Sequence, residues 1–202
     1  MRPADLHATS LSLPEARALV TRAARGAGHT WGVAEEAGWA AAWLAAHGHD
    51  WAAILLDVLT APGARDLALA PGAWQATSDL CPLITGIALA DFATLPEGPA
   101  LGLRLGPLHR PAMLLPFLDR AAQTLGHGLE PLCPDGEVVP LPRAEVVTLT
   151  PTGIPPAALA TQNVASVTPD QIARLDDLAN RTFVPSSARS RAGAGSQRSD
   201  ND

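Results

Sequence analysis

Apolar and polar residues alternate at helical spacing through the first sixty positions of the chain. Ser12-Leu13-Pro14-Glu15 is typical of a helix start, with serine at the cap and glutamate three residues later. This helix is expected to end at Gly26 and Gly28, and a second helix is expected from Gly32-Val33 to His47. Asp50 caps a third helix, which the turn residues at 61–63 end. The sequence therefore predicts a three-helix unit over residues 1–62.

The middle of the chain has a different pattern, in which proline and glycine separate short apolar runs. Runs of this length between turn residues are typical of strands. The predicted strands are 83–89, 101–105, 112–115, 129–132, 138–141 and 145–149. Residues 117–125 are spaced as a helix that ends at Gly126, and Pro134-Asp135-Gly136 indicates a turn. Residues 80–150 are thus predicted to form a mixed β-sheet with one embedded helix.

The last part of the chain divides into a helix and a tail. Thr168-Pro169-Asp170 opens a helix expected from Gln171 to Thr182. Beyond Pro185 no apolar residue is larger than alanine, so residues 185–202 are predicted to be a flexible tail. The predicted class is α+β, with one globular domain over 1–184.

Composition and charge narrow the classes of partner. Hydrophobic residues make up 47% of the 202 positions, which is enough for a folded core. The net charge is −6 and the 14 basic residues are scattered arginines, so neither nucleic acid nor an anionic membrane surface is an expected partner. The N-terminus lacks the apolar core of a signal peptide, and no window is apolar enough to span a bilayer. We expect a cytoplasmic protein whose partners are small molecules or proteins.

Motifs for metals, cofactors and nucleophiles are weak. Cys81 and Cys133 lie far apart without a CxxC pair, and no GxSxG motif occurs. His47-Gly48-His49-Asp50 resembles a metal triplet, but a helix end followed by a capping aspartate explains it without a metal. We predict no metal site, and no motif identifies a cofactor.

The stretch 24–51 contains four of the five tryptophans and three of the six histidines. Gly26 and Gly28 allow the backbone to bend sharply after the first helix, and Arg25 and His29 flank the bend. The amides at residues 31–34 begin the next helix, where the dipole attracts negative charge. This pattern predicts an anion site, and the alternative is a plain helix–loop–helix corner. It is not a dinucleotide loop, because the segment leaves a helix rather than a strand.

Two further tryptophans lie one helical turn apart on the second helix. Trp39 and Trp43 share a face with Glu35 or Glu36, which is a pattern of either core or pocket wall. We predict a pocket for a small anionic metabolite, walled by these indoles and by Trp31, in an enzyme or an accessory subunit. Glu35, Glu36 or His29 would then transfer protons. The alternative is an interaction module in which the alanine-rich helix 33–47 contacts another protein or a second copy of the chain.

Three blocks of this sequence resemble a family known only as domain of unknown function 3726. They are Arg22–Gly28, Trp31–Ala37 and the ending from Arg181 to Asp202. The family is known from proteobacteria, and the resemblance implies that the glycine corner and the tail belong to its pattern. A fainter similarity to the non-Rossmann malate/lactate dehydrogenases lies in Gly48-His49-Asp50. The Ser-His-Gly of those enzymes is absent here, so their catalytic histidine has no counterpart.

Overall fold

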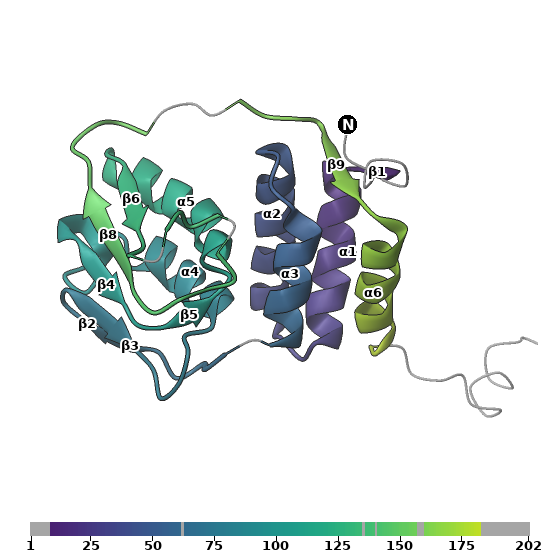
Figure 1. Ribbon diagram of the computed structural model, residues 1–202, viewed down its shortest axis with the longest axis horizontal. Coiled ribbons are helices and arrows are strands. Elements are labelled where there is room, and N and C mark those ends of the chain that lie inside the picture. The colour runs from purple at the N-terminus through teal and green to yellow at the C-terminus, as the bar shows by residue number, and fades with distance from the viewer. Residues whose placement is uncertain (1–8, 62, 135, 140, 157–159, 183–202) are drawn as a thin grey trace, which may run out of the picture.

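The computed structural model describes residues 9–61, 63–134, 136–139, 141–156 and 160–182. Figure 1 shows two halves that lie side by side. Residues 9–60 and 164–182 form a helical half, and residues 68–151 form a sheet half that contains the main sheet. The predicted α+β class is confirmed. The predicted tail, 185–202, lies outside the described residues.

The helices of the first half follow local signals in the sequence. They are α1 (Leu13–Gly26), α2 (Trp31–Ala46), α3 (Trp51–Thr60) and α6 (Pro169–Asn180). Ser12 accepts from the backbone N–H of Glu15 at 3.4 Å, and the Glu15 carboxylate accepts from the Ser12 N–H at 2.8 Å. Thr168 and Gln171 form the same reciprocal box at α6. Each cap stabilises its helix by about 1 kcal/mol.

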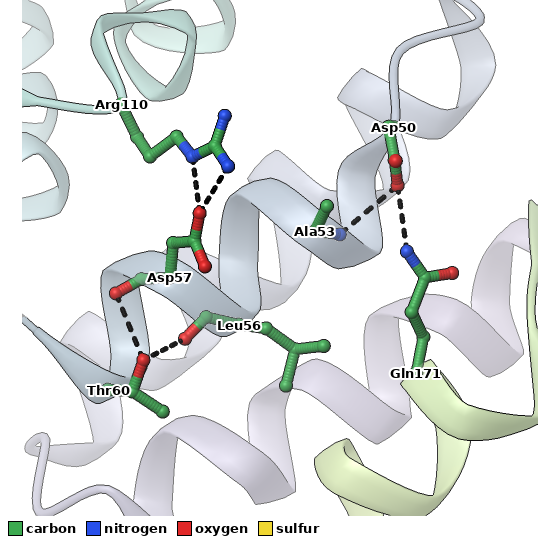
Figure 2. A network of polar contacts seen from close by, with 7 residues as sticks. All are labelled: Asp50, Ala53, Leu56, Asp57, Thr60, Arg110 and Gln171. Atoms are coloured by element: carbon green, nitrogen blue, oxygen red, sulfur yellow. Dashed lines mark hydrogen bonds and ion pairs between the residues drawn. The ribbon is translucent and has the colours of Figure 1, made fainter. Parts of the chain in front are cut away.

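The C-terminal helix closes the helical half. Strand β1 (Thr9–Ser12) pairs antiparallel with β9 (Val164–Val167), which directly precedes α6. The helix α6 then packs along α1. Asp50, the cap of α3, accepts from the backbone N–H of Ala53 and from the Gln171 side chain, each at 3.1 Å (Figure 2). The helix α6 therefore packs with the first three helices in the helical half.

The sheet half contains five strands in the order β2-β3-β4-β8-β6. The strands are β2 (Ala68–Ala70), β3 (Ala73–Gln75), β4 (Leu103–Leu105), β8 (Val147–Pro151) and β6 (Leu129–Leu132). Within this sheet β3 and β4 run parallel, and the other neighbours run antiparallel. A separate short pair joins β5 (Leu108–His109) and β7 (Arg143–Ala144).

Helices cover one face of this sheet. They are α4 (Pro82–Asp91) and α5 (Leu115–Leu125), accompanied by the 3₁₀ turns η2 (Pro99–Leu101) and η3 (Pro111–Leu114). Along β4, Leu103 and Leu105 are buried against the helices, while Arg104 between them is exposed. This alternation leaves the opposite face of β4 open to solvent.

Several predicted strands are wrong. Residues 83–89 form most of α4, and 112–115 form η3 and the start of α5. Residues 138–139 lie in a turn and 141 in irregular structure, so no strand begins there. A continuous apolar run fits a buried helix as well as a strand, and here Pro82 begins the helix. The sheet region therefore carries two α-helices rather than one.

One hydrophobic cluster extends across both halves. It joins the buried faces of α1, α2 and α3 to Leu83, Met113 and Phe117 of the sheet half. A second cluster lies between the sheet and its helices, around Trp74. The halves therefore share a core. None of the described helices is both long and apolar enough to cross a bilayer.

An ion pair also joins the two halves. The Nε and Nη2 atoms of Arg110 donate to one carboxylate oxygen of Asp57 on α3 (Figure 2). Arg110 has a φ of +47°, a left-handed conformation that costs a non-glycine residue about 1 kcal/mol. Pro111 follows directly and starts η3. The strained residue thus directs its guanidinium across the junction to Asp57.

Candidate functional site

The corner between α1 and α2 comprises residues 27–30. The backbone N–H of Ala27 donates to the carbonyl of Ala23 at 2.8 Å, and that of His29 donates to Ala24 at 3.1 Å. Gly28 has a φ of +88°, where a side chain would be strained. The turn reverses the chain and places the beginning of α2 beside the last turn of α1.

Two contacts hold Arg25 at this corner. Its Nη1 donates to the carbonyl oxygen of His29, and its guanidinium carbon lies 4.7 Å from the centroid of the Trp31 ring. A cation–π contact at such a site stabilises by about 0.5–1 kcal/mol. Arg25 is half-buried, whereas Trp31 is 66% exposed. A positive charge is therefore fixed at a surface that solvent reaches.

The N-terminus of α2 is uncapped. Thr30 precedes the helix with extended backbone but makes no side-chain capping hydrogen bond, and the first turn contains no acidic residue. The first N–H groups of a helix have no acceptor within it and form the positive end of its dipole. Thr30, Trp31 and Gly32 are exposed. The amide groups and the guanidinium of Arg25 can therefore attract an anion.

His29 lies beneath this surface rather than on it. The residue is 2% exposed, and its Nε2 has no hydrogen-bond partner among the described residues. Burial lowers the pKa of His29 below the ordinary value for histidine, and the charge of Arg65 lowers it further. The ring is consequently neutral near pH 7, and its backbone carbonyl, not its side chain, contacts Arg25.

Gly26 contributes close helix packing. A Cβ atom at this position would lie 1.7 Å from the carbonyl oxygen of Leu178 on α6. Glycine is therefore needed because the backbones of α1 and α6 approach closely here. Among the described residues, Gly28 and Gly32 have no such neighbour within 4 Å of an added Cβ.

Three more predicted site residues contact α5. The Glu36 carboxylate pairs with Arg120 at 2.9 Å, and the Arg120 guanidinium carbon lies 3.6 Å from the centroid of the Trp39 ring. The indole N–H of Trp43 donates to Asp119 at 3.0 Å. These side chains therefore line the junction between the halves, away from the α1–α2 corner.

Glu35 lies on a third face. It borders an open groove of about 680 Å³ that runs along α1 and is also lined by Arg17 and Asp176. The nine predicted residues are thus divided among four places. Arg25, Gly28, His29 and Trp31 meet at the corner; Glu36, Trp39 and Trp43 face α5; Gly26 packs on α6; Glu35 borders the groove.

Sequence reasoning missed the residues that complete the α5 contact. The sequence does not indicate a role for Arg120 or Asp119, because their partners on α2 lie 84 and 76 residues away. The only local signal is the helical spacing of 117–125, which says nothing of a partner helix. Contacts of this kind follow from the tertiary fold.

Two further candidates for chemistry, His47 and Cys81, lie in structural surroundings. His47 Nδ1 lies 2.7 Å from the Trp43 carbonyl oxygen, and the His47 ring stacks on the Trp43 ring. Cys81 is fully buried at the start of α4, and burial raises the pKa of its thiol. Within the described parts of the chain, no three His, Cys, Asp or Glu residues gather where they could hold a metal ion.

The α1–α2 corner lies within a segment that has recognisable relatives. Residues 11–100 match the DUF3726 family. The family is described as a protein of unknown function. The DUF3726 match extends from β1 through the corner and α4 to η2, and it ends before β4. No curated protein and no solved structure is significantly similar to the chain. The likeness to non-Rossmann dehydrogenases and the proteobacterial origin stay predictions.

Proposed function

We propose that the protein binds a small anionic molecule at the corner between α1 and α2. The observation that carries this proposal is the fixed guanidinium of Arg25 beside the uncapped, exposed N-terminus of α2. A charged donor and unsatisfied backbone N–H groups at one place are the elements that proteins use to hold phosphates and carboxylates.

The contacts of Arg25 favour binding because they already restrict its side chain, so less side-chain entropy is lost when a ligand binds. The guanidinium is already held by the His29 carbonyl and by the Trp31 ring. The Nη1 atom is engaged with His29, which leaves the remaining N–H groups to face a ligand. The surface is exposed, so the dissociation constant is expected to be about 1 mM, which corresponds to a binding free energy of roughly −4 kcal/mol.

The proposal concerns binding and assigns no reaction. The carboxylate of Glu36 is engaged by Arg120, and Glu35 borders a different surface. The imidazole of His29 is buried and faces away from solvent. The alternative of a protein interface on α2 stays a prediction, and its two expected anchors, Trp39 and Trp43, contact α5 within the chain.

Calorimetric titration with inorganic phosphate at constant ionic strength tests the proposal. Arg25→Ala should weaken binding about tenfold or more, which corresponds to the loss of one charge-assisted hydrogen bond. Arg22→Ala is the matched control, because Arg22 is an exposed arginine on the same helix. Arg22→Ala should leave the affinity unchanged.

Arg25→Lys provides a second variant, which keeps the charge but loses the planar fork. Its affinity should lie between those of wild type and Arg25→Ala. Equal phosphate affinity in wild type and Arg25→Ala would refute the proposal. The proposal would also fail if the wild-type protein did not bind phosphate at about 20 mM, which is 20 times the expected dissociation constant.

A further inference from the structure

A small cavity lies where the last turn of α2 meets α5 and β6. It has a volume of about 210 Å³. Trp43, at its border, comes twelve residues after the first residue of α2, so the cavity is about 18 Å along the helix from the α1–α2 corner. Most of its wall is apolar and includes Leu115, Leu118, Ala122, Leu129 and Pro131.

The polar groups of this wall are Asp119 and the indole N–H of Trp43. The Trp43 Nε1–H donates to Oδ2 of Asp119 at 3.0 Å, and the side-chain amide of Gln123 donates to the same oxygen at 3.0 Å. The His47 ring stacks on the Trp43 ring with 3.8 Å between centroids, which holds the indole in place. Both donors to Asp119 are neutral, so they orient the carboxylate without cancelling its charge.

The negative charge of Asp119 has no counterpart among the described residues. None of their ion pairs includes Asp119. The guanidinium of the neighbouring Arg120 is paired instead with Glu36 at 2.9 Å, and it lies over the Trp39 ring. Since Arg120 and Glu36 balance each other, the carboxylate of Asp119 leaves a net negative charge at the cavity.

The second oxygen of this carboxylate is accessible. Both hydrogen bonds of Asp119 end on Oδ2, and Oδ1 has no partner within the part of the chain that the structure describes. Over the same residues, the buried side-chain atoms without a partner are the Nε2 atoms of His29 and His109. Oδ1 is therefore not a buried atom, and it can accept a hydrogen bond from a ligand.

We propose that this cavity binds a short alkylammonium ion, with the ammonium group on Oδ1 of Asp119 and the alkyl chain against the apolar wall. An ammonium group is also attracted to the face of an indole ring, and Trp43 borders the same space. The volume is below the range of about 300–1,000 Å³ that is usual for ligand pockets, which favours a ligand of few carbon atoms. The site shares no residue with the proposed anion site at Arg25.

The charge of the ligand and its chain make separate contributions. An alkyl carboxylate would be repelled by Asp119. An ammonium ion without a chain would leave the apolar wall in water, and an alcohol of the same length would lose the charge-assisted hydrogen bond. The net charge of −6 adds a long-range attraction for cations in general but does not select the alkyl chain.

Nuclear magnetic resonance of the ¹⁵N-labelled full chain tests this inference in a titration with butylammonium chloride. The indole N–H resonance of Trp43, assigned by its loss in Trp43→Phe, reports on the cavity because this group donates to Asp119. Constant ionic strength and about pH 8, where histidine is ordinarily uncharged, limit other effects. The resonance should shift and saturate in the millimolar range, below about 20 mM.

Ammonium chloride, 1-butanol and butyrate are the matched probes, because they carry the charge alone, the chain alone and the opposite charge. Butylammonium should bind tenfold or more tightly than each of them. A Trp43 indole resonance that does not respond to butylammonium up to about 20 mM would overturn the inference. Equal affinity for ammonium would do so as well, because it would indicate attraction of cations without recognition of the chain.

A variant of the carboxylate locates the site. Asp119→Asn keeps the shape of the side chain and an oxygen for the Trp43 indole but removes the charge, so it should weaken butylammonium binding at least tenfold. Asp177→Asn makes the same change at an exposed position of α6 and should have no effect. Arg25→Ala should also have no effect, which separates this site from the phosphate site. Unaltered affinity in Asp119→Asn, with its circular dichroism spectrum as in wild type, would overturn the inference.

Discussion

Gly26 and Gly32 flank the same corner but are expected to respond oppositely to alanine. A Cβ atom at position 26 would lie 1.7 Å from the Leu178 carbonyl oxygen and 2.6 Å from its carbon. Both are backbone atoms, so α1 and α6 would have to separate by about 1.5 Å to restore normal contact. Overpacking of this kind typically destabilises by about 1–3 kcal/mol.

Urea denaturation and thermal melting measure this effect. Gly26→Ala should lower the melting temperature by roughly 2–12 °C, since each kcal/mol shifts the melting temperature of a domain of this size by about 2–4 °C. Gly32→Ala is the control, because no atom of the described residues lies within 4 Å of the added Cβ. It should be neutral or stabilising by up to about 1 kcal/mol, because alanine favours helix. Wild-type stability in Gly26→Ala would refute the close packing of α1 on α6.

Three further predictions concern buried or bridging charges. The folded state keeps His29 neutral with a lowered pKa, so the free energy of unfolding should fall as pH drops below the ordinary pKa of histidine. Urea titrations across about pH 5–8 should show a weaker dependence of the free energy of unfolding on pH in His29→Phe. Arg120→Ala should destabilise by about 1 kcal/mol, and a double-mutant cycle with Glu36→Gln should assign part of this loss to their pair. Asp57→Asn should lower stability by about 1 kcal/mol in wild type and little in Arg110→Ala, measured by urea denaturation.

Helices with local start and stop signals could be predicted from the sequence. Ser12 and Asp50 each accept a backbone N–H of the helix that follows them, as predicted from residue type and spacing. The ends of the first three helices were predicted to within about two residues, the usual uncertainty of helix boundaries. These signals act within one turn of the chain, so no tertiary information is needed.

The strands were harder to predict. Strands β2 and β3 have three residues each, too few to show a period, and β1 pairs with β9, which lies more than 150 residues later in the chain. The apolar run 83–89 was wrongly predicted as a strand because a buried helix is equally apolar. Within α4, Gly86 packs against Phe117 of α5, and this contact requires the tertiary fold.

The candidate site was predictable where its residues are close in sequence. Arg25, His29 and Trp31 meet because they span a single turn. Trp39 and Trp43 were predicted to join this corner, but both contact α5 instead. An apolar helix face indicates burial but does not indicate which element will cover it.

The central claim, an anion site at the start of α2, is tested most directly by nuclear magnetic resonance. In a titration of ¹⁵N-labelled protein with inorganic phosphate at constant ionic strength, the amide resonances of Trp31, Gly32 and Val33 should shift together and saturate. In Arg25→Ala the same resonances should shift with at least tenfold weaker affinity. Resonances at 31–33 that do not respond to phosphate in the wild-type protein would contradict the account.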